Sequence, residues 1–500
     1  MPEYIRSLIV ILVLASIVFA LAKAPATAFA MSTEDYVRRR NTWFLITLAG
    51  FLSQSFWIFS IATVIIISVS AKTEKNKVAL WCFLILAIPL VKVEIPGFAG
   101  IRYLIEIDYL RILTAILLIP LVVGYRRKSV VEKHPTLAPD IILAIYVIYN
   151  VVLTSRVGDI VAISRTGIGW LIDVVIPYYA ISRYVKNLNR FRDLIMSLTV
   201  VGMISASVAV FEFSRGWMLY DSFGEALSLD WTTGYLVRGK FVRAVSSSGI
   251  AIVLGYVLAL VIILYLYLYK IIHAKAIYLI GLALLIAGAV APLSKGPWIG
   301  MVTAIIIFFA MGPSATKNIM TLVLIGLPVG LLAMVTDTGS KIVDYLPFIG
   351  GVDEANTSYR TNLLRVSINA FSDNPFFGSA YFMTLMEEAR NGEGLIDLVN
   401  HYVGVALYSG LFGLSLFAGF FITILYQLFN KLRIFENKSE EHALGRSLFA
   451  ALCSALIMIS SASSINHVPI FYYMLAGLSV GYINMHNSRN TEFTTRVNSR

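Results

Sequence analysis

Long apolar segments separated by short polar loops follow one another along the whole chain. A helix needs about 20 apolar residues to cross a bilayer, and most of these segments reach or approach that length. The pattern predicts an all-α polytopic membrane protein with about 12–14 transmembrane helices. The segments are 5–22, 43–71, 78–95, 104–124, 138–154, 163–182, 194–213, 249–269, 276–292, 297–312, 319–335, 401–429, 447–463 and 468–485.

Three of these segments are irregular. The run 43–71 is long enough for a tilted helix or a tight hairpin. The run 78–95 is weakened by a proline and by charged residues near its end. The first run is preceded by Arg6 and followed by small residues, as in a signal peptide, but its length favours an uncleaved membrane helix.

Composition agrees with a membrane protein. Hydrophobic residues make up 58% of the chain and charged residues only 14%, and the mean hydropathy is +0.79. The formal net charge of +11 resides largely in short loops, where it indicates membrane topology rather than nucleic-acid binding. Cys82 and Cys453 lie in different apolar segments, which favours neither a disulfide nor a thiolate metal site.

The alternation of Lys/Arg-rich loops predicts which loops share a side. Cytoplasmic loops carry an excess of Lys and Arg, and one alternation places nearly all such loops, and both termini, in the cytoplasm. The segments 214–248, 292–297 and 336–400 then lie outside. Arg38, Arg39 and Arg40 are the exception: either the first segment does not span, or these residues act at the outer headgroups.

The same alternation defines the expected organisation. Residues 1–335 form transmembrane helices and include the outer loop 214–248, residues 336–400 form a periplasmic loop or lid, and residues 401–486 form the C-terminal transmembrane helices. We expect one membrane domain overall, because no repeat or soluble domain is visible.

Arginine and lysine residues in the outer segments are the first candidate functional residues. Arg238 and Arg243 precede a Ser-rich helix start, where guanidinium groups can bind phosphate oxygens, or alternatively lipid headgroups. Lys295 lies in a very short break between Pro292 and Pro297. Such a lysine either snorkels to headgroups or lines a wet cavity with a fixed, irregular backbone.

The long outer loop and its exit supply the other candidates. Residues 357–371 have the pattern of a capped amphipathic helix on the outer membrane surface, with Arg360 and Arg365 five positions apart, so that only one need point inward. His401 opens a glycine-rich helix and is either an interfacial polar residue or a base for a hydroxyl. His467 is interpreted as a loop residue.

No phosphate-binding loop, HExxH motif or aspartate-rich metal pair is present, so we expect neither metal nor cofactor.

Four features in succession resemble the O-antigen ligase and Wzy-type polymerase superfamily: Arg243 before its Ser/Gly-rich helix start, Ser294-Lys-Gly-Pro-Trp298, Arg360 through Asn374-Pro-Phe-Phe-Gly378, and Asn400-His-Tyr followed by Ser409-Gly-Leu-Phe-Gly-Leu414. The resemblance covers roughly residues 236–420 and rests on the order and spacing of the motifs.

The resemblance implies a GT-C-like membrane glycosyltransferase of the bacterial inner membrane. Such an enzyme acts without a metal at the periplasmic face on an undecaprenyl-pyrophosphate-linked glycan, with a glycan or lipid-linked acceptor, the bilayer and a chain-length regulator as partners. The family's arginine falls on Arg243, its Ser-Arg-Gly motif on Ser294-Lys295-Gly296, and its histidine on His401. Two positions depart from the family pattern, since Lys295 replaces an arginine and Tyr402 replaces an asparagine.

The combined hypothesis is an inverting transfer. Arg243, Lys295 and one of Arg360 or Arg365, with Arg238 nearby, bind the pyrophosphate, and His401 orients or deprotonates the acceptor hydroxyl. Polymerisation of O-antigen or exopolysaccharide is favoured over ligation, because nothing marks a docking domain for a lipid A core. A flippase or other polytopic transporter is the alternative, and it predicts internal symmetry and a midplane site.

Overall fold

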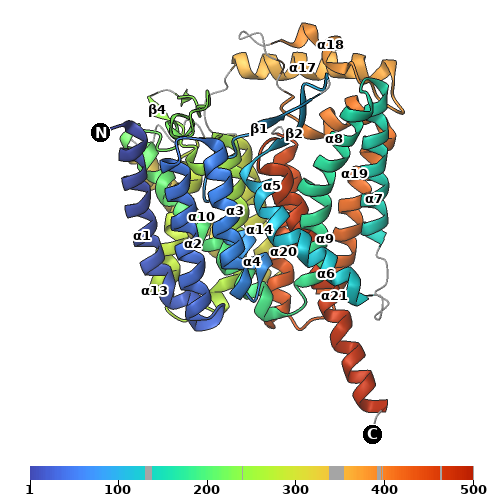
Figure 1. Cartoon of the computed structure of the whole chain (residues 1–500). Coiled ribbons are helices and arrows are strands. Elements are labelled where there is room, and N and C mark those ends of the chain that lie inside the picture. The colour runs from blue at the N-terminus through green and yellow to red at the C-terminus, as the bar shows by residue number, and fades with distance from the viewer. Residues whose placement is uncertain are drawn as a thin grey trace.

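The chain folds into a bundle of long helices, capped at one end by a helix that lies across the bundle (Figure 1). The computed structural model describes residues 1–98, 100–129, 138–238, 240–336, 354–390, 396, 398–461 and 464–498. Nine helices in these ranges are long and apolar enough to cross a membrane, and three shorter apolar helices accompany them. The predicted all-α polytopic class is confirmed.

Figure 1 shows the 216–250 segment, with β4, and helix α17 at the top of the bundle, and we call this end the upper face. The elements of the first half are α1 (Glu3–Phe29), α2 (Thr33–Leu52), α3 (Phe56–Thr73), α4 (Lys77–Leu84), β1 (Val93–Pro96), β2 (Tyr103–Ile107), α5 (Tyr109–Leu113), η1 (Thr114–Leu118), α6 (Ile119–Ser129), α7 (Ala138–Leu153), η2 (Thr154–Arg156), α8 (Ile160–Trp170), η3 (Leu171–Val175), α9 (Ile176–Tyr184) and α10 (Leu188–Arg215).

The second half completes the bundle and the upper face. Its elements are α11 (Phe223–Ala226), β3 (Val237–Arg238), β4 (Phe241–Val242), η4 (Ser246–Ser248), α12 (Ala251–Tyr267), η5 (Leu268–Lys270), α13 (Lys275–Val290), α14 (Lys295–Ala310), α15 (Ala315–Val335), α17 (Glu354–Asp373), α18 (Phe382–Leu385), η6 (Glu387–Ala389), α19 (His401–Leu432), α20 (Glu440–Ile459) and α21 (Val468–Asn498). The predicted helix 357–371 is present as α17. Residues 337–353, 391–395 and 397 of the predicted periplasmic loop lie outside the described residues.

The irregular run 43–71 contains a hairpin rather than one helix. Helix α2 ends at Leu52 and α3 begins at Phe56, so the chain turns within three residues. Gln54 in this turn has a φ of 50°, a conformation that is uncommon outside glycine. Because this run belongs to two helices instead of the single predicted span, α1 runs through the bundle in the direction opposite to the predicted one.

The N-terminus therefore lies on the upper face. Glu3 accepts a hydrogen bond from Trp217 Nε1 at 2.9 Å, and Arg6 stacks on the same indole, which belongs to the 214–248 loop. Figure 1 shows the C-terminus at the opposite end. The expectation that both termini lie opposite this loop is wrong for the N-terminus.

The same reversal accounts for the exceptional arginines. Arg39 is fully buried and pairs with Glu74 at 2.8 Å and with Asp193 at 3.1 Å, while Arg38 also pairs with Glu74 at 2.8 Å. These partners lie between α3 and α4 and at the start of α10, at the end of the bundle away from the upper face. The arginine cluster thus joins the Lys/Arg-rich loops and follows the charge rule.

The weak run 78–95 is not a full-length helix. Helix α4 ends at Leu84, and residues 85–92 continue without regular structure before the β1–β2 hairpin. Buried carbonyls need partners, and here the Tyr109 hydroxyl binds Leu84 O at 3.0 Å while Ser247 Oγ binds Leu86 O at 2.7 Å. The irregular backbone is thus held inside protein, where it is tolerated at membrane depth.

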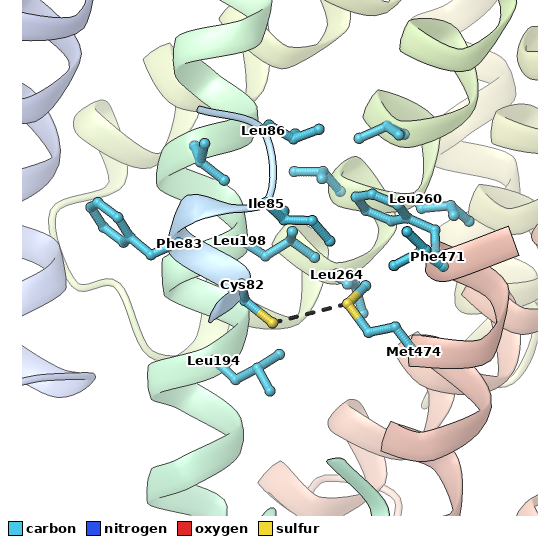
Figure 2. Packing of buried hydrophobic residues seen from close by; sticks show 14 of the residues in the cluster. Cys82, Phe83, Ile85, Leu86, Leu194, Leu198, Leu260, Leu264, Phe471 and Met474 are labelled. Carbon is cyan, nitrogen blue, oxygen red and sulfur yellow. Dashed lines mark hydrogen bonds between the residues drawn. The ribbon is translucent and has the colours of Figure 1, made fainter. Parts of the chain in front are cut away.

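The core surrounds this unwound segment. Figure 2 shows side chains of α4, α10, α12 and α21 packed against the segment itself, with the Cys82 thiol 4.0 Å from the sulfur of Met474. Cys82 and Cys453 are both free thiols. The residues labelled there are Cys82, Phe83, Ile85, Leu86, Leu194, Leu198, Leu260, Leu264, Phe471 and Met474.

Candidate active site at the upper face

The first part of the site is the break between α13 and α14, residues 291–294. Arg243 donates from Nε to Pro292 O at 3.0 Å and from Nη2 to Ser294 Oγ at 2.9 Å. Arg238 donates from Nη1 to Leu293 O at 2.6 Å. Two cations from the β3–β4 hairpin therefore converge on a helix break that is some fifty positions away in sequence.

Arg243 keeps its charge in this setting. Partial burial, together with the nearby charge of Arg238, lowers the pKa of Arg243 to about 10, so the guanidinium remains protonated at neutral pH. No carboxylate among the described residues forms an ion pair with Arg243. A half-buried cation without a neighbouring acid is suited to binding an anion.

Lys295 begins α14 directly after the break. Its ammonium group makes no hydrogen bond or ion pair with any residue that the structure describes. The next residue, Gly296, lies so close to α20 that an added Cβ would come within 2.4 Å of Ser461 Oγ. The lysine is thus held beside the upper end of α20.

The second part of the site is a pocket with an empty volume of about 560 Å³ between α17 and the start of α19. Its polar lining comes from Arg360, Ser367, Asn400 and Ser460, and the apolar lining comes from Leu363, Leu364, Leu398, Val399 and Val403. Ser460 and Ser461 are consecutive residues at the end of α20. The pocket and the Lys295 break therefore meet at the same helix end.

His401 stands at the edge of this pocket. Its half-buried ring packs edge-on against Phe417, with ring centroids 5.3 Å apart, and lies 6.2 Å from Tyr472. Its neighbour Asn400 lines the pocket and uses Oδ1 to accept from Tyr402 N at 2.9 Å. The imidazole itself makes no hydrogen bond with any residue in the described part of the chain.

Three further residues were singled out from the sequence. Tyr402 is no companion for the imidazole, because its hydroxyl donates to Leu456 O at 2.9 Å. Arg365 points away from the pocket, with Asn362 Oδ1 at 3.0 Å and Glu388 at 3.6 Å. His467 lies in a loop, as expected, but is fully buried, and burial lowers its pKa to about 4.

The site also uses a residue that sequence reasoning missed. Glu212, fully buried at the upper end of α10, accepts hydrogen bonds from the backbone N–H groups of Leu219 at 3.1 Å and of Val245 and Ser246 at 2.9 Å. It thereby holds the chain two residues beyond Arg243. The only signal in the sequence is an acidic residue at the end of an apolar segment, which does not reveal its partners.

Fold and site together define a polytopic helical membrane protein with a cationic, partly apolar site at one face. Residues 280–418 match the family model Wzy_C, described as O-antigen ligase. The match confirms the predicted superfamily over this region, which includes Lys295, Arg360, Arg365 and His401. At the level of that family the function is of the O-antigen ligase type, which implies glycosyl transfer between membrane-associated substrates. No curated protein matches the chain.

Proposed function

We propose that the protein is an inverting, metal-independent glycosyltransferase of the bacterial inner membrane. It polymerises undecaprenyl-pyrophosphate-linked oligosaccharide at the periplasmic face, and ligation of the glycan to a lipid A core is the second candidate. The observation that supports this most is the convergence of Arg238, Arg243 and Lys295 on one helix break beside the pocket of Arg360.

In this proposal the donor's pyrophosphate binds at the helix break. Arg243 and Lys295 face no carboxylate among the described residues, so their charges are available to the leaving group. Arg360 contributes from the other wall of the pocket, whereas Arg365 is engaged at the surface of α17. Preorganised cations stabilise the charge that develops on the departing pyrophosphate.

The transfer step follows from these positions. The acceptor hydroxyl oxygen attacks the anomeric carbon of the donor sugar, the bond from that carbon to the phosphate oxygen breaks, and undecaprenyl pyrophosphate leaves with the electron pair. His401, one residue beyond the pocket-lining Asn400, receives the hydroxyl proton. Attack opposite the leaving group inverts the anomeric configuration.

The test uses purified protein in nanodiscs with undecaprenyl-pyrophosphate oligosaccharide, with and without a lipid A core acceptor, and products resolved by size. A ladder without core identifies a polymerase, and transfer only to core identifies a ligase. No transfer in either mixture contradicts the proposal and favours a transporter.

His401→Ala should lower turnover by about 10²–10⁴-fold, the usual contribution of a general base. His467→Ala is the matched control, because His467 lies outside the pocket. Equal turnover of His401→Ala and wild type would exclude the imidazole as the base.

A further inference from the structure

Helix α19 is interrupted where the 374–378 turn touches it. Gly410 has φ 67° and ψ −169°, a conformation that glycine alone adopts readily. The interruption frees the next backbone N–H groups from the helix, and they donate instead to the turn: Leu411 N to Pro375 O at 2.8 Å and Phe412 N to Phe376 O at 3.2 Å. The turn thus replaces the missing helical hydrogen bonds.

Two glycines permit this close approach. A Cβ added to Gly410 would lie 2.3 Å from backbone atoms of Phe376, and one added to Gly378 would lie 2.6 Å from Leu407 O. Ser379 N also donates to Leu407 O at 2.8 Å. Backbone therefore meets backbone on both sides of the interruption.

Arg156, at the end of η2, closes this junction. Its Nη1 donates to Phe377 O at 3.0 Å and to Gly378 O at 2.9 Å, and its Nη2 donates to Tyr408 O at 2.7 Å. The guanidinium carbon also lies 5.4 Å from the ring centroid of Tyr408. One side chain therefore binds carbonyls of the turn and of the short first half of α19.

The two segments that Arg156 joins lead to the two walls of the pocket. The turn directly follows α17, which carries Arg360, and Tyr408 ends the half-helix that begins at His401. Leu407 and α17 residues Leu363 and Val366 also share a small core. The relative position of the two walls thus depends on the junction at Gly410.

We propose that Arg156 is a positioning residue for the transfer reaction: by fixing the 374–378 turn in the α19 interruption, it holds Arg360 and His401 in register across the pocket. This inference rests on the proposed function. Arg156 lies outside the region matched by the family model. It touches neither Arg360 nor His401 and acts through the backbone.

The junction depends on a planar fork. A guanidinium presents several donors in fixed directions, whereas an ammonium is a single rotating point charge. Arg156→Lys should retain part of the junction and Arg156→Ala none. Because small misplacements of reacting groups are costly, kcat should fall about 100-fold in Arg156→Ala and less in Arg156→Lys, with KM changing much less.

The matched control is Arg165→Ala. Arg165 lies on the next helix, stacks on Tyr103 with its guanidinium carbon 3.8 Å from the ring centroid, and contacts neither segment of the junction. This variant removes the same charge and should leave kcat within about twofold of wild type, because Arg165 contacts no described residue of the pocket or of the junction. An equal loss in both variants overturns the specific role of Arg156.

Hydrogen–deuterium exchange tests the junction without depending on enzyme activity. In Arg156→Ala the amides of Ser379, Leu411 and Phe412 should exchange faster, while those of α10 should not change, which separates loss of the junction from general unfolding. Unchanged exchange at the three amides, or unchanged kcat when exchange is faster, overturns the inference. If the wild-type protein transfers no glycan, the proposed function is contradicted. Unchanged exchange at the three amides in Arg156→Ala, in contrast, contradicts the role of Arg156.

Discussion

At the scale of single residues, charged side chains hold the site together by binding backbone groups of distant segments: Glu212 accepts from Val245 N at 2.9 Å, and Arg156 donates to Tyr408 O at 2.7 Å. Arg243 and Lys295 were predicted because cations on the outer side of a membrane protein are unusual. Glu212 and Arg156 were missed because each binds backbone groups, whose identity leaves no trace in the sequence. The partner of Arg243, the α13–α14 break, is likewise defined only by the folded chain.

Glu212 provides a prediction at this scale. Glu212→Gln keeps the size of the side chain but turns one accepting oxygen into an N–H₂ group that faces backbone donors. The cost of an unsatisfied buried donor is about 1–3 kcal/mol. We expect a lower thermal unfolding midpoint in detergent and weaker donor binding, because the chain beside Arg243 loses its anchor.

Glu225→Gln is the control for this change, since Glu225 is an exposed acid in the same loop. It should alter neither stability nor donor binding. If Glu212→Gln matched Glu225→Gln in both measurements, the anchoring role of Glu212 would be wrong.

At the scale of elements, helix type was easier to predict than helix ends. The helix over 357–371 is present because its apolar positions recur at helical spacing, and Leu363, Val366 and Ala370 are indeed buried. The hairpin within 43–71 was not resolved, because apolar residues continue on both sides of the turn and only Gln54 and Ser55 depart from the helical region. The unwound stretch after α4 depends on hydroxyl partners from other elements, including Tyr109 of α5 and Ser247 of η4.

The 374–378 turn gives a prediction at this scale. Phe376 and Phe377 are 65% and 63% exposed, and they adjoin Leu411 and Phe412 of α19, each 48% exposed. Exposed aromatic side chains next to a membrane-spanning helix are stable when lipid surrounds them. We therefore expect a nitroxide at Phe377→Cys to collide more with oxygen than with a polar nickel reagent.

A nitroxide at Glu388→Cys serves as the reference for water. Glu388 lies on the same side of the bundle and its side chain is 76% exposed. The polar reagent should reach this label freely. Equal access of the polar reagent to positions 377 and 388 would place the turn in water.

At the scale of the whole molecule, the site is assembled from both halves of the chain. The family match covers residues 280–418, yet Arg238, Arg243, Glu212 and Arg156 lie before it. The matched region supplies Lys295, both pocket walls and His401, and the first half supplies the anchors and two of the cations. The order of motifs indicated the superfamily that residues 280–418 match, whereas the way the halves meet required the fold.

The direction of the first helix is the prediction that belongs to this scale. Because the 43–71 run forms two helices, residue 2 should share a side with the 214–248 loop. Pro2→Cys and Lys240→Cys should therefore react with a membrane-impermeant maleimide added to the same side of sealed vesicles, whereas Lys75→Cys should react only from the other side. Wild-type protein measures the background from Cys82 and Cys453, which lie within helices. Labelling of residue 2 together with residue 75 would contradict the hairpin. The positive cluster Arg38–Arg40 would then again stand apart from the other Lys/Arg-rich loops, against the charge rule that the fold now satisfies.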